Sequence, residues 1–115
     1  MSEQISVASF DSQLEAISDP ERRRLLLALL ETTRNGETPI DAGSIESDGD
    51  ERALDIRMAH VHLPKLEALG YVDSHREDDS NRGRRLVADG PQFDGIRPLL
   101  ELLEDNEALL PEDLR

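Results

Sequence analysis

The chain has 115 residues, and its 26 acidic and 13 basic side chains give it a formal net charge of −13. The length favours one domain, and the lack of cysteine excludes a disulfide scaffold and thiolate metal sites. The sequence has no apolar run of about 18 residues that would predict a membrane span, and no basic leader that would predict a signal peptide. Leu, Ile, Val and Phe supply 30 of the 115 residues, more than the roughly one fifth found in disordered acidic chains, so we expect a folded, soluble, cytoplasmic domain.

Two helices are predicted near the start of the chain, after a loose tail over residues 1–9 in which no pattern is visible. Apolar side chains recur at helical spacing over 10–17 and predict a short amphipathic helix. A longer helix follows, which Ser18 or Asp19 can cap and which the Asn-Gly pair ending at Gly36 should terminate.

The weakest pattern lies over residues 36–51. Ile40, Ala42 and Ile45 are spaced so that they can cover part of a core. We expect one short helix near 41–47, followed by an acidic loop.

The next predicted helix runs over 56–69, and a rotation of 100° per residue gives it two sides. One side should pack on the core and carries Ile56, Ala59, Leu63, Leu66 and Gly70. The other should be exposed and carries Arg57, Val61, Pro64, Lys65 and Ala68. Because Pro64 removes a hydrogen bond inside a helix, we expect a kink at Pro64 or a helix that begins near His60.

A hairpin and a last helix complete the predicted order. Alternating side chains predict strands over 71–76 and 84–88, joined by a polar tip over 77–83. Leucines then recur at helical spacing, and Pro98 should divide this segment into a short turn and a main helix over about 98–109.

The basic residues are distributed unusually, since twelve are Arg and only Lys65 is Lys. A surface rich in Asp and Glu and almost free of Lys is typical of proteins that work in concentrated salt, where a Debye length of about 3 Å at 1 M screens self-repulsion. We therefore expect a protein of a halophilic cell; the alternative is an acidic protein of an ordinary cell.

Two segments resemble a known family. Residues 19–30 (DPERRRLLLALL) are similar to the D-P-x-R-x-x-I-L-x-x-L helix of ArsR-like winged-helix regulators. Residues 62–72 (HLPKLEALGYV) resemble the H-L-x-x-L-x-x-x-G-L-V segment that ends their recognition helix and begins the wing. The H-x-H-L-P-K-L form of residues 60–66 more specifically resembles a group of small haloarchaeal winged-helix proteins.

The resemblance implies an α+β, mainly α fold, namely a winged helix-turn-helix with a two-stranded β wing and flanking N- and C-terminal helices. It implies a winged-helix domain over 10–89 and a C-terminal helical segment over 90–115. The chain departs from the family pattern in its poorly formed helix before the recognition helix, in Pro64 and in the absence of thiolate metal-sensing motifs. Metal-responsive derepression is therefore not carried over.

The charge is partitioned in a way that permits DNA binding. Residues 52–88 hold seven basic and six acidic side chains, a net charge of +1, against −14 for the rest of the chain. Together with the resemblance, this predicts a set of DNA contacts on the helix and the wing: Arg57, His60, Val61, Pro64, Lys65, Arg82, Arg84 and Arg85. The alternative is a solvated face with ordinary arginines.

Concentrated salt limits how such a site could hold DNA, because affinity falls with salt for each phosphate neutralised. Base-edge and apolar contacts would then carry more of the binding energy. Val61 and Pro64 could touch thymine methyl groups or could be buried against another segment.

The histidines invite a metal hypothesis that helix geometry disfavours. His60 and His62 are two positions apart and point about 200° from each other on a helix, so they cannot close on one ion with His75. We expect His62 on the core side, no metal, no cofactor and no enzymatic activity, since no carboxylate pair or nucleophile stands out.

The C-terminal leucines exceed what one small core can hide and predict a dimer interface of Leu99, Leu102, Leu103, Leu109 and Leu110. The sequence thus favours a sequence-specific transcriptional regulator that binds double-stranded DNA as a homodimer, with no membrane association. The alternatives are a winged-helix interaction module that binds an unknown protein and never DNA, and a ligand sensor with a pocket between the C-terminal helix and the core.

Overall fold

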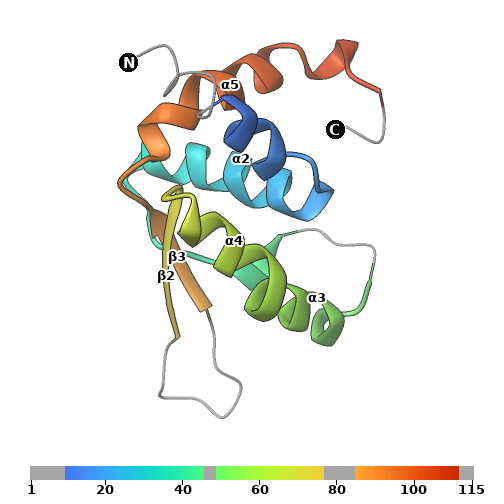
Figure 1. The fold of residues 1–115 in the computed structure, drawn as a ribbon, viewed down its shortest axis with the longest axis vertical. Helices are drawn as coiled ribbons and strands as arrows, with labels where there is room; N and C mark the ends of the chain where they lie inside the picture. Colours follow the sequence, from blue (N-terminus) through green and yellow to red (C-terminus); the bar gives the residue numbers. More distant parts are fainter. Residues whose placement is uncertain (1–9, 46–48, 77–84, 112–115) are drawn as a thin grey trace.

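The computed structural model describes residues 10–45, 49–76 and 85–111 (Figure 1). The protein is mainly helical with a small antiparallel sheet, which confirms the α+β, mainly α class. After a helical segment over 10–16, the helices are α2 (Pro20–Asn35), α3 (Glu51–Arg57), α4 (Leu63–Ala68) and α5 (Phe93–Asp105). The strands are β1 (Ile40–Asp41), β2 (Val72–Arg76) and β3 (Arg85–Asp89).

The N-terminal helices form as the sequence predicts. The Asp19 carboxylate caps α2 by accepting from the backbone N–H groups of Glu21, at 2.8 Å, and Arg22, at 3.3 Å. Gly36 ends the helix with a φ of 69°, a left-handed conformation that a side chain disfavours. Both ends of α2 are therefore set by local chemistry that a sequence displays.

The expected helix near 41–47 is wrong. Its place is taken by β1 and by one turn of 3-10 helix, Ala42–Ser44. Ile40 pairs with Val87 of β3, while the Asp41 carboxylate accepts from the Gly43 N–H at 2.8 Å. Pairing with a strand some 45 residues away decides this segment, and no local pattern announces it.

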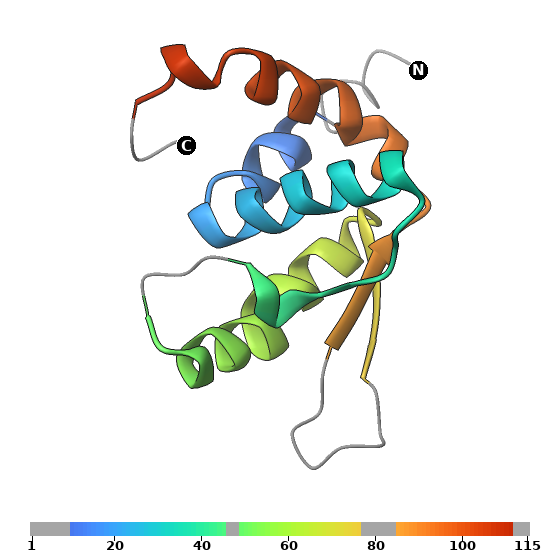
Figure 2. The ribbon, with the colours of Figure 1, turned by 180° about the vertical axis from the view of Figure 1, so that it is seen from behind.

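The hairpin strands lie within one residue of their predicted bounds, but the sheet is larger than expected. β2 pairs antiparallel with β3, and β1 adds to the other edge of β3, so the strand order is β1-β3-β2. The predicted two-stranded hairpin thus has a third strand along one edge, opposite Leu86 and Val87. Figure 2 shows the sheet from behind. The hairpin tip, with Arg82 and Arg84, lies outside the described residues.

The central helix begins at Glu51, five residues before its predicted start, because the Asp50 carboxylate caps it by accepting from the Ala53 N–H at 2.7 Å. α3 continues through a π turn, Met58–His62, into α4. We call the whole segment the helical stretch 51–68. The wide turn lies just before Pro64, whose missing N–H would interrupt a regular α-helix.

The π turn changes which side of this stretch is buried. The Leu63 N–H donates to the Met58 carbonyl five residues back, and both side chains lie in the core. Ile56, which the sequence places on the core side, is 55% exposed, since the buried series is Leu54, Met58, Leu63 and Leu66. A uniform 100° rotation cannot follow a turn that holds one extra residue.

The predicted division at Pro98 is also wrong, because α5 runs through it from Phe93 to Asp105. Phe93, Ile96 and Leu100 are fully buried in the core. Their burial contributes more than the roughly 3 kcal/mol that an interior proline costs a helix. A turn of 3-10 helix, Glu107–Leu109, follows.

One core joins all of these elements, with α2 at its centre. Leu25, Leu26, Leu29 and Leu30 of α2 are completely buried. α5 covers one side of α2, while the helical stretch 51–68 and the sheet lie at the opposite end of the molecule (Figures 1 and 2). Among the described residues, no helix is long and apolar enough to cross a membrane.

Candidate nucleic-acid interface

The two basic residues expected on the exposed side of the helical stretch 51–68 are both bound to acidic side chains. The Arg57 Nε donates to Glu21 Oε1 at 2.7 Å and its Nη2 to Oε2 at 2.5 Å, and this hydrogen bonding raises the pKa of Arg57. Lys65 forms an ion pair with Glu15, which lowers the pKa of that carboxyl group. Both contacts turn these cations toward the N-terminal helices.

The outer side of the same stretch carries several exposed apolar side chains among charged ones. Ile56 is 55% and Val61 50% exposed, and His60 and Pro64 are exposed as well. Of the two alternatives for Val61 and Pro64, the structure therefore favours the exposed one. We call the exposed side chains of Ile56, Val61 and Pro64 the apolar stripe.

A groove of about 420 Å³ separates this helical stretch from the sheet. Its walls come from α3, the π turn, the 3-10 turn at Ala42–Ser44 and the ends of β2 and β3 that lead into the hairpin tip. The charged and titratable groups on them are Arg52, His60, Arg76 and Arg85 with Asp41, Glu51 and Asp55. We call this feature the helix–sheet groove.

Arginines from three elements gather at this groove. Arg76 and Arg85 are register partners on β2 and β3, and Arg52 faces them from α3. Within the described part of the chain these three form no ion pair, unlike Arg57 and Lys65. Their guanidinium groups can therefore donate to an external acceptor such as a phosphate oxygen.

The sequence interpretation counted Arg52 and Arg76 among the bases of this region but did not select them, whereas Arg85 was selected and lines the groove. The available signal was the position of Arg76 at the end of the first predicted hairpin strand and of Arg85 one residue inside the second. Strand pairing places such residues opposite each other. Arg52 had no comparable signal, because the helix that carries it was predicted to start later.

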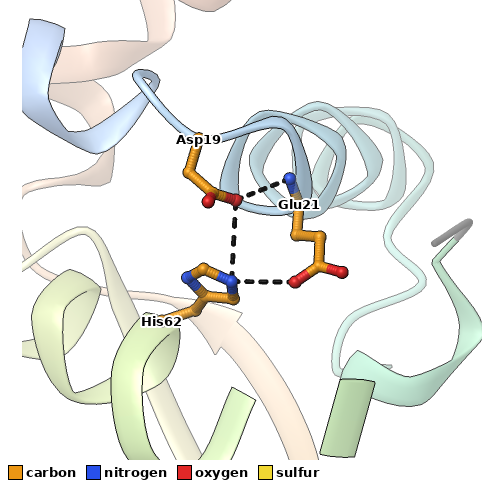
Figure 3. A group of neighbouring side chains, drawn as sticks. All are labelled: Asp19, Glu21 and His62. Atoms are coloured by element: carbon orange, nitrogen blue, oxygen red, sulfur yellow. Dashed lines mark hydrogen bonds and ion pairs between the residues drawn. The ribbon is translucent and has the colours of Figure 1, made fainter. Parts of the chain in front are cut away.

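His62 is confirmed as a core residue, being 2% exposed, and it joins a buried polar cluster (Figure 3). Its Nε2–H donates to Glu21 Oε1 at 2.9 Å, and Asp19 Oδ1 lies 3.5 Å from the same nitrogen. Arg22 Nη1 donates to Nδ1 at 3.2 Å. This pattern fits the neutral imidazole with its proton on Nε2. We call Asp19, Glu21, Arg22, Arg57 and His62 the junction cluster.

The ligand atoms of Asp19, Glu21 and His62 lie within 4.8 Å of one another, as a metal site would require. Several of their lone pairs are already used, because Asp19 Oδ1 accepts from two backbone N–H groups and both Glu21 oxygens accept from Arg57. The guanidinium groups of Arg22 and Arg57 also oppose the entry of a cation. The cluster therefore acts as a hydrogen-bonded connection between α2 and the helical stretch 51–68.

The C-terminal leucines are only partly covered. Leu102 is 59% and Leu109 82% exposed, while the others of the predicted interface, Leu99, Leu103 and Leu110, are half-buried. Phe10 and Leu14 of the helical segment 10–16 are exposed too. That segment contacts α5 through the Gln13 side chain, which donates to the Gly95 carbonyl at 3.0 Å. Apolar surface therefore remains at this end of the molecule.

Comparisons with family models, with curated proteins and with solved structures gave no match for the chain. The case for a function therefore depends on the chain's own residues. Two features of the described surface bear on it most directly, the arginines of the helix–sheet groove and the apolar stripe beside them.

Proposed function

We propose that the chain is a winged helix-turn-helix protein that binds double-stranded DNA and regulates transcription in the cytoplasm of a halophilic cell. In this proposal the helical stretch 51–68 is the recognition helix and the β2–β3 hairpin is the wing. The observation that carries it is the gathering of Arg52, Arg76 and Arg85 at one groove of a chain whose net charge is −13. The resemblance of residues 60–72 to a winged-helix recognition segment supports it.

The location of these arginines suits a ligand with spaced phosphates. They project from the helix and from both wing strands, so that one phosphate backbone could meet all three. Asp41, Glu51 and Asp55 line the same groove and balance the three arginines, so general attraction to a polyanion is weak there. Binding would depend on a few well-placed contacts, which is what concentrated salt permits.

The structure changes the list of contacts that we propose. Arg57 and Lys65 leave the list of proposed contacts, because Glu21 and Glu15 neutralise their charges. Arg52 and Arg76 take their place in the list. The remaining sequence candidates, His60, Val61, Pro64 and Arg85, stay with them, as do Arg82 and Arg84 of the hairpin tip. Arg57 then serves to position the recognition helix.

A homodimer completes the proposal. The exposed Leu102 of α5 and Leu109 of the 3-10 turn that follows it, together with Phe10 and Leu14, would be covered by the same surface of a second copy. A twofold dimer presents two recognition helices to successive turns of DNA. Its direct check is the oligomeric state in molar KCl.

The proposal is tested by selecting bound duplexes from a random DNA pool and comparing two double variants. Arg76→Ala/Arg85→Ala removes two groove charges, and Arg34→Ala/Arg97→Ala removes two charges that pair with Glu101 on α5. The first should bind selected DNA less tightly, with a log K against log [KCl] slope shallower by about 1.8, whereas the control should bind normally. Absence of any enriched duplex would reject DNA binding.

A protein-docking module is the second candidate, and the apolar stripe favours it. Ile56 and Val61 expose apolar surface of the kind found at protein interfaces. Under this alternative the selection enriches no duplex, and Arg76→Ala/Arg85→Ala and Arg34→Ala/Arg97→Ala bind the random DNA pool equally weakly.

A further inference from the structure

We infer that the recognition helix reads thymine through its 5-methyl group, so that the preferred DNA site is rich in thymine at the positions facing the apolar stripe. This inference rests on the proposed DNA-binding function and names the base that the function would select. The apolar stripe of Ile56, Val61 and Pro64 is the structural feature that carries it.

The helical stretch 51–68 has few groups that read bases by hydrogen bonds. Its sequence, ERALDIRMAHVHLPKLEA, contains no Asn, Gln, Ser or Thr. The usual bidentate reader of adenine is an Asn or Gln side chain, so it is missing from this helix. Arg57 and Lys65, which could read guanine, are bound to Glu21 and Glu15. Arg52 and His60 are left as exposed donors, and the exposed carboxylates of Glu51, Asp55 and Glu67 can only accept.

The exposed apolar residues lie along one side of the helix. Val61 follows Ile56 by five positions across the π turn, and Pro64 follows Val61 by three in the regular helix beyond it. The wide turn therefore keeps all three on the outer side, where a regular helix would move Ile56 toward the core. An apolar row of this length can meet more than one base pair.

The thymine methyl is the one apolar group on the major-groove edges of the four bases. An exposed row of apolar side chains is complementary to it and to no other base edge. Arg52 lies one turn before Ile56, and Arg76 and Arg85 lie across the helix–sheet groove. Their charges complement the phosphates that flank a major groove, which favours DNA over an apolar protein surface as the occupant.

Concentrated salt strengthens the case for this kind of readout. Contacts between a methyl group and apolar side chains do not depend on charge, so salt does not screen them. A few phosphate contacts would set the position of the helix, and the methyl contacts would supply discrimination that persists in molar KCl.

The test replaces thymine by uracil, one position at a time, in the duplex selected by the unaltered protein. Uracil keeps every hydrogen-bonding group and lacks only the methyl. We expect about fourfold weaker binding for each contacted methyl that is removed. The variant Ile56→Ala/Val61→Ala should lose this sensitivity. The control Arg34→Ala/Arg97→Ala, which changes only side chains paired with Glu101, should keep it.

The outcomes separate the two proposals. Tight binding of a selected duplex with no uracil effect at any position would overturn the thymine inference and leave DNA binding intact. A selection that enriches no duplex would overturn both. A uracil effect that persists in Ile56→Ala/Val61→Ala would show that other residues read the methyl, and would also reject the inference as stated.

Discussion

The inner and outer sides of the helical stretch 51–68 use the same residue types in opposite ways. On the inner side Arg57 and His62 meet Glu21 at 2.5–2.9 Å, and the junction cluster holds the helix on α2. On the outer side Arg52 and His60 face the helix–sheet groove, and Arg52 has no ion pair within the described residues. The type of side chain thus does not distinguish Arg57, which is paired with Glu21, from Arg52, which we propose as a DNA contact.

The largest effect is expected when the carboxylate of Glu21, which Arg57 and His62 share, is removed. Glu21→Ala leaves the Arg57 guanidinium and the buried His62 imidazole without their shared acceptor. We expect the free energy of unfolding to fall by about 2–4 kcal/mol, since the groups left behind are partly or fully buried. Urea titration in molar KCl measures it. Glu101→Ala, which removes an exposed partner of Arg34, should cost about 1 kcal/mol or less.

A smaller effect on stability is expected from Arg57→Ala, whose stability and DNA affinity can be compared with those of Arg85→Ala. Arg57→Ala should cost about 1–2 kcal/mol of stability, because Glu21 keeps His62 as a donor, and should leave DNA affinity unchanged once folding is complete. Arg85→Ala should do the reverse, with stability within about 0.5 kcal/mol and weaker DNA binding. Urea titration measures the free energy of unfolding of both variants, and DNA titration measures their affinity. Equal loss of DNA binding in both variants would return Arg57 to the contact surface.

The smallest effect concerns Lys65 and depends on pH. The pKa of Glu15 lies below its ordinary 4.5 because Lys65 hydrogen-bonds to the carboxylate. The pair therefore stabilises the fold above pH 4.5, and this contribution is lost as the pH falls through the lowered pKa. Lys65→Met should be slightly less stable than the unaltered chain near neutrality and equal to it in acid. A difference that grows on acidification would contradict the assignment.

Where the sequence interpretation succeeded, the deciding interactions are short-range. Asp19 caps α2 through the N–H groups of the next two or three residues, and Gly36 ends it in a conformation that glycine adopts freely. The hairpin strands follow from alternation, and the placement of His62 in the core follows from its spacing to Leu66. Each of these signals is complete within one or two helical turns or one strand.

Where it failed, partners distant in the chain decided the outcome. β1 exists because Ile40 meets Val87, and α5 passes through Pro98 because its flanking apolar residues fit the core beside α2. The start of the helical stretch 51–68 was missed because an acidic loop was expected where Asp50 supplies a cap. The π turn then altered the phase that a regular helix would have kept.

The sequence by itself determined the charge of −13, its concentration outside residues 52–88, the capped α2 and the hairpin. Only the tertiary structure decided which cations are available to a ligand. Arg57 and Glu21 are 36 positions apart, and Lys65 and Glu15 are 50 apart, so their pairing exists only once α2 and the helical stretch 51–68 pack together. Local patterns determine which helix or strand carries a side chain. Coulomb attraction and burial between elements distant in the chain determine which partner its charged group binds.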